Sequence, residues 1–387
     1  MTRRLFAVLS LALALRLIAA FVCDGQTFSS DEAHWQRMAE FFWRDGVFSP
    51  EAGFFRPPLY PLVVAGVYDV LGYHPFAVRL VQALLSTATC ALVFAIARAA
   101  RGERAGLYAG LLAACHPLMV FFSGVFMAET LLLACVAAIL WQVQCVVARP
   151  SAKRAAVLGA MLALGALCKP VVLAWLPLLL VMIWLCGPRP SIRVATVVVA
   201  LVLCVMPWTL RNIEVSGHAV PISTNLGINL LVGHEPGATG RYSDAVDYWQ
   251  LMEEIAAPER DPVLRDAVVA RRVLAHIADE PLRALRLAAT KVVLLWSPLG
   301  EGAPMLRTLV NSLTSATVLA LGGLGLWHMR RDPVGWAAAS LAVALMGIYA
   351  LFFAHVRFRL PIDLALIAPA ACWLAHYFPG KSTDERV

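Results

Sequence analysis

The chain has 387 residues, of which 60% are hydrophobic and only 15% are charged, and its mean hydropathy is +0.73. A soluble protein of this length would need a more charged surface, so the composition excludes a water-soluble enzyme and indicates an integral membrane protein. The apolar stretches are long and do not alternate strictly, which favours helices over a β-barrel. The formal charge of +7 gives no reason to expect a nucleic-acid partner.

Ten stretches are apolar and long enough to be candidates for membrane-spanning helices. In chain order they cover residues 5–22, 77–97, 105–122, 125–147, 154–168, 171–186, 192–210, 307–327, 334–353 and 360–377. The first resembles a signal peptide, but its small-residue cleavage pattern is poor and further spans follow, so we expect an uncleaved first helix. The nine cysteines lie mostly in apolar runs and indicate no disulfide framework.

Two further apolar stretches, residues 57–72 and 286–299, are ambiguous, and the distribution of basic residues decides them. Basic clusters occur at Arg3–Arg4, Arg98/Arg101/Arg104, Arg149/Lys153/Arg154, Arg189/Arg193 and Arg330–Arg331. If all of them are cytoplasmic, an even number of spans separates any two, so the two ambiguous stretches must lie in the outer interface. The sequence therefore predicts an all-α polytopic membrane protein of about ten spans, with both termini inside and in-plane helices on the outer face.

This topology divides the chain into three parts. Residues 1–211 form an N-terminal transmembrane module whose first outer loop is 23–76, residues 212–306 form a second outer loop with helices and an interfacial segment, and residues 307–387 supply the C-terminal spans. Charges bordering hydrocarbon cost roughly 2.5–3.5 kcal/mol each, so their gathering on one side indicates a functional site. The polar residues placed on the outer side are Asp31, Glu32, Arg56, Glu129, Lys169, Arg211, Arg357 and Arg359.

The stretch SSDEAHWQRMAEFF follows the first predicted span and carries an acidic pair, Asp31 and Glu32. Ser29 and Glu32 have the spacing of a capping box, so a helix is expected to begin here with both carboxylates in its first turn. A helix N-terminus favours the ionised form of Asp31, which keeps it able to accept a proton or bind a cation. The acids could equally serve only to cap the helix. An in-plane amphipathic helix is predicted, resting on lipid through Trp35, Met38, Ala39 and Phe42.

Arg56 stands in the phrase FRPPLYP, in which two prolines stiffen the approach to the predicted in-plane helix 57–72. From this point the chain resembles the GT-C glycosyltransferases that use polyprenyl-phosphate sugars, most closely the protein O-mannosyltransferases and the lipid A aminoarabinose transferases. That superfamily carries an acidic motif of D-E or D-x-D type in its first outer loop. An R/K-P-P-L-Y-P phrase follows on a helix parallel to the membrane.

Later phrases continue the resemblance in the same order, and the ordered set is more specific than any single phrase. They are AVRLVQALLSTATCALVFAIAR, HPLMVFFSGVFMAETLLL, CKPVVL, PWTLRN, GINLLVGHEPG and HVRFRLPI, which together cover most of residues 1–365. The chain departs from the family in being short, in lacking the C-terminal soluble domain of some members, and in carrying HEPG where a G-N type turn is common.

The resemblance implies transfer of a sugar from a polyprenyl-phosphate donor to a lipid, polysaccharide or protein acceptor, with inversion at the anomeric carbon. By match to the family motifs, Asp31 is the expected base, and Glu32 or Glu129 is expected to orient the acceptor or hold a divalent cation. The expected location is the plasma membrane, the bacterial inner membrane, with the site facing the periplasm or exterior. The residues expected to bind the donor are Arg56, Tyr60, Lys169, Arg211, Asn229, Arg357 and Arg359.

A metal is left undecided at this point, and no cofactor is expected beyond a candidate divalent cation. Asp31, Glu32 and His34 are candidate ligands, as are His234 and Glu235, but their spacing follows no recognised pattern. His116 is expected to be a satisfied core histidine. Each basic candidate also has a structural alternative, because an arginine or lysine at the end of a span can be a snorkelling anchor.

The main alternative function is a polytopic transporter or flippase of a lipid-linked or anionic substrate. Transporters place charges and broken helices near the midplane, often in two related halves, whereas here only Arg16 lies well inside a span and no halves are evident. A lipid-linked polymerase or ligase is a second alternative, for which a D-E pair after the first span is not expected. The gathering of charges at one face favours catalysis at an interface.

Overall fold

A computed structural model of the chain describes residues 3–46, 54–297 and 305–378. Within these ranges every regular element is a helix, and the strand-like pairing is an isolated parallel bridge between Arg241 and Ala354. The first half contains α1 (Arg3–Val22), α2 (Ser30–Asp45), α3 (Leu59–Leu71), α4 (Pro75–Cys115), α5 (Pro117–Gly124), α6 (Glu129–Ala148), α7 (Ala152–Cys168), η1 (Pro170–Trp175), α8 (Leu176–Leu185) and α9 (Pro190–Ser216). The second half contains α10 (Leu226–His234), α11 (Tyr248–Ala256), α12 (Pro262–Asp279), α13 (Pro281–Trp296), α14 (Met305–His328), α15 (Pro333–Leu351), η2 (Val356–Arg359) and α16 (Leu360–Tyr377).

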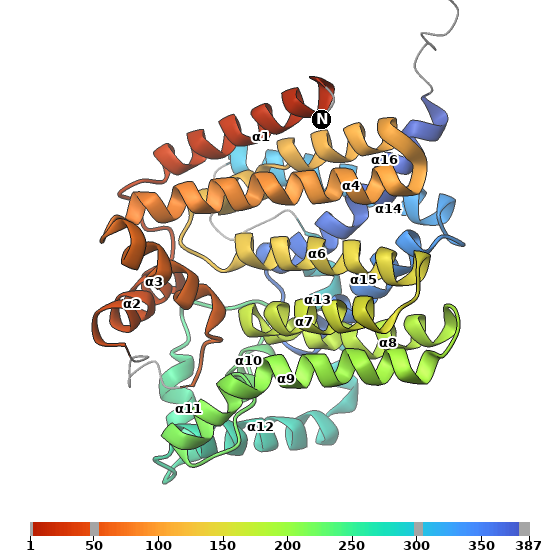
Figure 1. Ribbon diagram of the computed structural model, residues 1–387. Coiled ribbons are helices and arrows are strands. Elements are labelled where there is room, and N and C mark those ends of the chain that lie inside the picture. The colour runs from red at the N-terminus through yellow and green to blue at the C-terminus, as the bar shows by residue number, and fades with distance from the viewer. Residues whose placement is uncertain (1–2, 47–53, 298–304, 379–387) are drawn as a thin grey trace, which may run out of the picture.

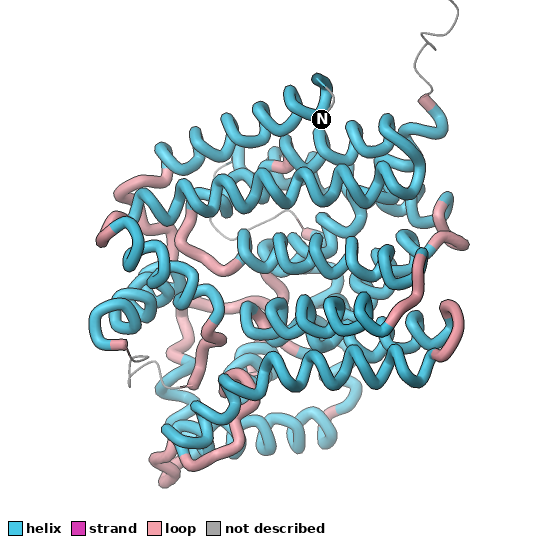
Figure 2. The backbone as a smooth tube through the Cα atoms, in the orientation of Figure 1, coloured by secondary structure: helices cyan, strands magenta, loops and turns pink. Residues whose placement is uncertain are grey.

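The long helices form a bundle with two different ends (Figure 1). At one end lie α2, α3 and the short helices α10 and α11, together with many of the irregular segments of the chain (Figure 2). At the other end lie the start of α1, the end of α16 and the tight turns that follow α6, α8 and α14. An ion pair of 3.0 Å joins Arg101 to Asp332 between two turns at this second end. The predicted basic clusters and the predicted site residues are thus at opposite ends of the bundle.

Seven described helices are long and apolar enough to cross a membrane by length and composition: α1, α4, α6, α9, α14, α15 and α16. Ten spans were predicted, and the difference has two causes. The predicted spans 154–168 and 171–186 are the shorter α7 and the η1–α8 pair, which fall below the length criterion. The predicted spans 77–97 and 105–122 lie largely within the single 41-residue α4.

α4 is two helices running in opposite directions. Arg101 and Gly102 have non-helical backbone angles, with φ of 83° at Gly102, a conformation that glycine adopts without steric cost. A Cβ placed on Gly106 would lie 2.9 Å from the ring of Phe94, and one on Gly110 would lie 3.6 Å from the Cβ of Phe94. The chain therefore folds back on itself after Arg101, as two separate spans require.

Arg16 lies fully buried in α1, and its donors serve backbone carbonyls at the end of α4. Nη1 donates to the carbonyl of Ala114 and Nη2 donates to that of Ala113, both at 3.0 Å. Pro117 has no N–H to give to the carbonyl of Ala113, so the helix break leaves acceptors without helical partners. The guanidinium satisfies them and also complements the negative end of the helix. Arg16 therefore has a structural role at this helix break.

We expect Arg16→Leu to destabilise the bundle, because each buried carbonyl left without a donor costs about 1–3 kcal/mol. The melting temperature in detergent should fall by several degrees, while Arg37→Leu, at an exposed position of α2, should leave it unchanged. An Arg16→Leu protein as stable as the parent would show that these contacts carry no stability.

The prediction that one face of α2 rests on lipid is wrong. Trp35, Met38 and Ala39 are buried on one face as the spacing indicated, but that face packs against protein. The ring of Trp35 lies edge-on to Tyr60 of α3, with centroids 5.5 Å apart, and Met38 contacts Leu62. Amphipathic spacing defines which face is apolar, but it does not distinguish a lipid surface from a neighbouring helix.

The segment predicted as the second outer loop, residues 212–306, is largely helical where it is described, and both of its proline-marked helix starts are confirmed. α12 begins at Pro262, with the side chain of Asp261 accepting hydrogen bonds from two backbone N–H groups, and α13 begins at Pro281. α13 ends at Trp296, and residues 298–299 of the predicted interfacial segment lie outside the described residues.

Candidate functional site

Asp31 lies in the first turn of α2, where local sequence fixes its place. The Ser29 hydroxyl accepts a hydrogen bond from the N–H of Glu32, as the capping spacing predicted. A carboxylate in the first helical turn is stabilised by the helix dipole. The Asp31 side chain keeps 29% of its exposure, so it is accessible at the end of the bundle.

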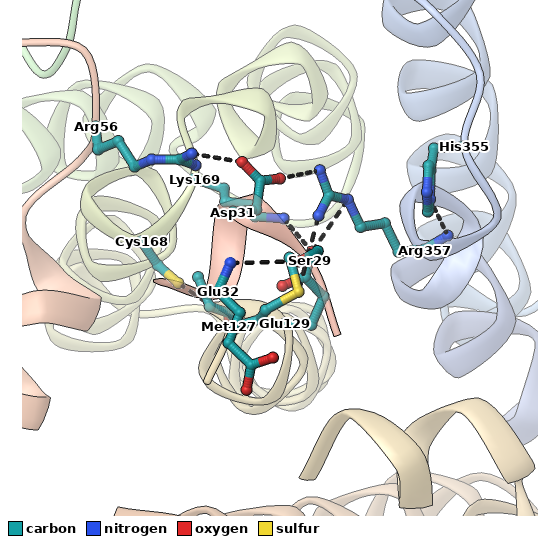
Figure 3. Close-up of polar contacts among 11 residues, drawn as sticks. Ser29, Asp31, Glu32, Arg56, Met127, Glu129, Cys168, Lys169, His355 and Arg357 are labelled. Atoms are coloured by element: carbon teal, nitrogen blue, oxygen red, sulfur yellow. Dashed lines mark hydrogen bonds and ion pairs between the residues drawn. The ribbon is translucent and has the colours of Figure 1, made fainter. Parts of the chain in front are cut away.

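Two arginines from distant parts of the chain hold Asp31 between them (Figure 3). Arg56 Nη2 donates to Oδ1 at 2.5 Å, and Arg357 Nη2 donates to Oδ2 at 2.6 Å. Arg56 is itself held over the ring of Trp35, with 4.7 Å from its Cζ to the ring centroid. Burial alone would raise the pKa of Asp31, but the guanidinium groups of Arg357 and Arg56 outweigh burial and hold that pKa well below its usual range.

Glu129 forms the second carboxylate of the site, in the first turn of α6. It is 1% exposed, and its Oε1 accepts a hydrogen bond from Lys169 Nζ at 2.5 Å and lies 3.8 Å from Arg357 Nε. Its other oxygen, Oε2, is buried and has no hydrogen-bond partner within the described residues. Arg357 therefore joins the two carboxylates.

The five residues Asp31, Arg56, Glu129, Lys169 and Arg357 form what we call the charged cluster. Three cations face two carboxylates, so the cluster carries a net positive charge and attracts an anion. The side chain of Arg56 is 15% exposed, that of Lys169 is 18% exposed and that of Arg357 is 17% exposed. They are shielded enough for their charge to act strongly, and still accessible to a ligand.

Glu32 lies beside the cluster but faces away from it, into the protein. It is 2% exposed, and both of its oxygens accept backbone hydrogen bonds, from Phe28 at 2.8 Å and from Phe126 at 2.9 Å. Glu32 therefore ties the start of α2 to the segment that leads into Glu129.

The structure places the other four predicted donor-binding residues outside the cluster. The Tyr60 hydroxyl donates to Gln82 at 2.8 Å in the core, and Asn229 donates to the carbonyl of Asn225 at 2.6 Å. Arg211 lies over the rings of Trp208 and Phe54, as an interface anchor would. The fourth, Arg359, points into the core.

Arg359 belongs to a buried network that the sequence did not reveal. Its Nε donates to Asp363 Oδ2 at 3.0 Å, and that oxygen lies 3.4 Å from His116 Nε2, with all three side chains nearly or fully buried. His116 Nδ1 also accepts from the N–H of Met119, as expected for a core histidine. The spacing of Arg359 and Asp363, one helical turn apart, was the signal for this pair.

The candidate metal ligands Asp31, Glu32 and His34 do not fit a cation in this arrangement. Both Asp31 oxygens bind guanidinium groups, whereas both Glu32 oxygens bind backbone N–H groups on the side away from the cluster, so the two carboxylates do not converge on one point. Within the described residues no group of three or more His, Cys, Asp or Glu could hold a metal ion.

His34 provides a pH test of the site. Burial and the charges of Arg56 and Arg37 lower its pKa to about 4, and among the described residues its buried Nε2 has no hydrogen-bond partner. Between that value and the ordinary value of about 6.5, the unfolded chain binds a proton that the folded chain does not, so stability falls as pH falls through this window. We expect His34→Gln to reduce the loss of melting temperature between pH 7 and pH 5.

The matched control for His34→Gln is His74→Gln, at an exposed position after α3. If both variants kept the pH dependence of the parent, the folded protein would not exclude a proton from His34.

The family comparison covers the part of the chain that contains Arg56 and Lys169. Residues 55–209 match the family described as dolichyl-phosphate-mannose-protein mannosyltransferase. No curated protein sequence matches the chain.

Solved structures match nearly the whole chain at low sequence identity. The archaeal oligosaccharyltransferase AglB from Archaeoglobus fulgidus, in complex with an inhibitory peptide and a dolichol-phosphate, is 13% identical with a TM-score of 0.60, covering 97% of this chain and 50% of that one. The Archaeoglobus fulgidus oligosaccharyltransferase in complex with Zn and sulfate is 13% identical with a TM-score of 0.54, covering 95% and 48%. ArnT from Cupriavidus metallidurans bound to undecaprenyl phosphate is 18% identical with a TM-score of 0.48, covering 94% and 77%.

The chain spans about half the length of the oligosaccharyltransferase. At 13% sequence identity the likeness concerns the fold alone. The resemblance expected from the ordered sequence phrases is confirmed: this chain is a multi-pass membrane protein with the GT-C fold, and its residues 55–209 match the dolichyl-phosphate-mannose-protein mannosyltransferases.

Proposed function

We propose that the protein is a membrane glycosyltransferase that moves a sugar from a polyprenyl-phosphate donor to an acceptor, at the end of the bundle that carries the charged cluster. The observation that carries the proposal is the position of Asp31, an accessible carboxylate held between two arginines in a net positive cluster. AglB, which has the same fold, was solved with a dolichol-phosphate. A lipid phosphate is the anion that such a cluster at a membrane surface fits best.

The donor phosphate binds to the cations of the cluster. Arginine forms paired hydrogen bonds with phosphate oxygens, and Arg56 and Arg357 both present guanidinium groups to the same point. The Lys169 ammonium is near the same site through its bond to Glu129. These groups also stabilise the charge that develops on the departing polyprenyl phosphate.

An apolar cavity of about 290 Å³, lined in part by Pro58 and Leu167, each two positions in sequence from a cluster residue, suits the start of a polyprenyl chain. Its walls come from α3, α7 and α9, the neighbours in sequence of Arg56, Lys169 and Arg211. The lining residues are Pro58, Leu59, Leu62, Leu167, Cys204, Pro207 and Trp208.

Asp31 acts as the base after the donor has displaced its arginines. While both guanidinium groups bind it, the lowered pKa makes Asp31 a poor proton acceptor. A phosphate that takes the same hydrogen bonds leaves Asp31 with less positive charge around it, and its pKa rises. The acid limb of kcat, which reports the complex, should therefore lie at higher pH than the acid limb of kcat/KM, which reports the free enzyme. Coincident limbs in the two pH profiles would contradict this exchange.

The transfer is a single displacement. Asp31 takes the proton of the acceptor hydroxyl as its oxygen bonds to the anomeric carbon, and the bond from that carbon to the phosphate oxygen breaks with its electrons. The polyprenyl phosphate leaves and the configuration inverts. Glu129 Oε2, which has no hydrogen-bond partner among the described residues, accepts a hydrogen bond from the acceptor and orients it.

The division into an N-terminal module 1–211, an outer loop 212–306 and C-terminal spans 307–387 is part of the proposal. The basic turns face the cytoplasm and the charged cluster faces the periplasm or exterior, as the bias of Lys and Arg favours. A cysteine at position 45 should react with an impermeant maleimide from outside, and a cysteine at position 153 should not. The reverse pattern would place the site on the cytoplasmic side.

The test of activity uses membranes that contain the protein and a panel of radiolabelled polyprenyl-phosphate sugars. Transfer of label to a lipid, polysaccharide or protein fraction, dependent on the protein, is the expected result. A transporter would instead move label across the membrane with the sugar–phosphate bond intact. That outcome would replace the proposed function.

A further inference from the structure

Two cations of α13 bind the C-terminal ends of neighbouring helices. Arg283 donates to the carbonyls of His234, Glu235 and Pro236, at 3.2, 2.6 and 3.2 Å, where α10 ends. The last carbonyls of a helix have no partners within it, and they carry the negative end of the helix dipole. A guanidinium at this point satisfies both needs.

Lys291, two helical turns further along α13, binds the end of α15. It is fully buried, and its Nζ donates to the carbonyl of Leu351 at 3.2 Å and lies 3.1 Å from His234 Nε2. His234 Nε2 is in turn 2.8 Å from the same Leu351 carbonyl. Leu351 is the last residue of α15 and His234 is the last residue of α10, so one ammonium meets the ends of two helices.

A buried ammonium with no carboxylate against it is costly for stability alone. The described ion pairs join no Asp or Glu to Lys291. Burial and Arg283 lower the pKa of Lys291 to about 8, and burial and Lys291 lower the pKa of His234 to about 4. At neutral pH the imidazole is therefore neutral and the lysine is mostly charged.

The segment that follows α15, residues 352–357, contacts α10 and the chain after it before it reaches Arg357 of the charged cluster. A Cβ on Gly233 would lie 1.8 Å from the carbonyl oxygen of Phe352, so only glycine allows α10 to approach this closely. The N–H of Ala354 donates to the carbonyl of Gly240 at 2.8 Å, and His355 Nδ1 accepts from the N–H of Arg357. These contacts hold successive residues of the backbone between Leu351, which Lys291 binds, and Arg357.

We propose that Lys291 is a positioning residue for the charged cluster: by tying the ends of α10 and α15 together, it fixes the backbone from which Arg357 reaches Asp31 and Glu129. The role in transfer rests on the proposed function, whereas the fixing of the backbone does not. Sugar transfer at a site of this kind is sensitive to displacement, because a shift of about 1 Å can cost about 100-fold in rate.

The test compares Lys291→Met with Arg286→Met, which removes an exposed cation from the same helix. Lys291→Gln is the second variant, because its amide can still donate to Leu351 if the methionine variant does not fold. Hydrogen exchange is measured in the full protein for peptides covering residues 350–359 and, as an internal reference, residues 130–145. Donor binding and transfer are measured on the same preparations.

We expect exchange in residues 350–359 to rise by about tenfold or more in Lys291→Met, with the reference peptide unchanged. Donor affinity and kcat should both fall by about tenfold or more, with Lys291→Gln intermediate and Arg286→Met like the parent. Unchanged exchange in residues 350–359 would overturn the fixing of the backbone. Faster exchange with parental donor binding and transfer would overturn its link to the site. If the parent itself transferred no sugar, the proposed function would fail while the exchange result still decided the role of Lys291 in the fold.

Discussion

Asp31→Asn should abolish most sugar transfer while the donor still binds. General-base catalysis contributes about 100- to 10,000-fold, so kcat should fall by that factor. Asparagine carries no charge to hold Arg56 and Arg357, which now bind Asp31 at 2.5 and 2.6 Å, so both arginines are free for the phosphate. Polyprenyl phosphate should therefore bind as tightly as in the parent or more tightly. The measurements are initial rates with labelled donor and equilibrium binding of polyprenyl phosphate.

Asp69→Asn is the control for this substitution, because Asp69 is exposed on α3. Transfer by Asp31→Asn at the parental rate would remove Asp31 as the base. A loss of donor binding equal to the loss of rate would indicate that Asp31 organises the binding site and takes no proton.

Glu129→Leu should cost both stability and activity. The substitution leaves Lys169, whose Nζ lies 2.5 Å from the lost carboxylate, without its buried counter-charge, while Arg357 keeps only its pair with Asp31. Removing one partner of a buried pair costs about 3–5 kcal/mol, whereas replacing both partners by apolar groups is often neutral. The double variant Glu129→Leu/Lys169→Met should therefore recover most of the lost melting temperature. It should not recover transfer, since it lacks both the carboxylate and a phosphate-binding cation.

The double variant separates the two roles of the pair. If transfer returned together with stability, Glu129 and Lys169 would be structural residues only. Melting in detergent and transfer with labelled donor, made on the same samples, decide between the two outcomes.

The sequence predicted the members of the charged cluster better than their contacts. Asp31, Arg56, Glu129, Lys169 and Arg357 each stand at a helix end, where a charge in an apolar chain is conspicuous. Their order along the chain carried the resemblance, and the fold is confirmed. Pairing between residues such as Asp31 and Arg357 is set by the packing of helices 326 positions apart, which no local pattern encodes.

Arg357 and Arg359 illustrate the limit of local reasoning. They were treated alike in the sequence, as a pair flanking Phe358 before a span. In η2 the chain turns by about 120° per residue, so side chains two residues apart point in different directions. Arg357 reaches Asp31, while Arg359 turns into the core toward Asp363.

Buried polar residues that serve the backbone were the least predictable. Lys291 and Arg283 have the spacing of solvent-facing residues on an amphipathic helix. No neighbouring sequence pattern predicts that they bind the carbonyls at the ends of α10 and α15. α2 shows the same limit from the apolar side, since its spacing identified the buried face but not the helix that covers it.

The two backbone bonds accepted by Glu32 make its side chain a spacer of fixed length. One oxygen accepts from the N–H of Phe28, three residues before Asp31, and the other accepts from the N–H of Phe126, three residues before Glu129. The length of the Glu32 side chain therefore sets the distance between the backbone segments that carry the two acids. An aspartate is shorter by one methylene and would not span that gap. Among chains with this arrangement, the second letter of the acidic pair should therefore vary less freely than its lack of direct chemistry suggests.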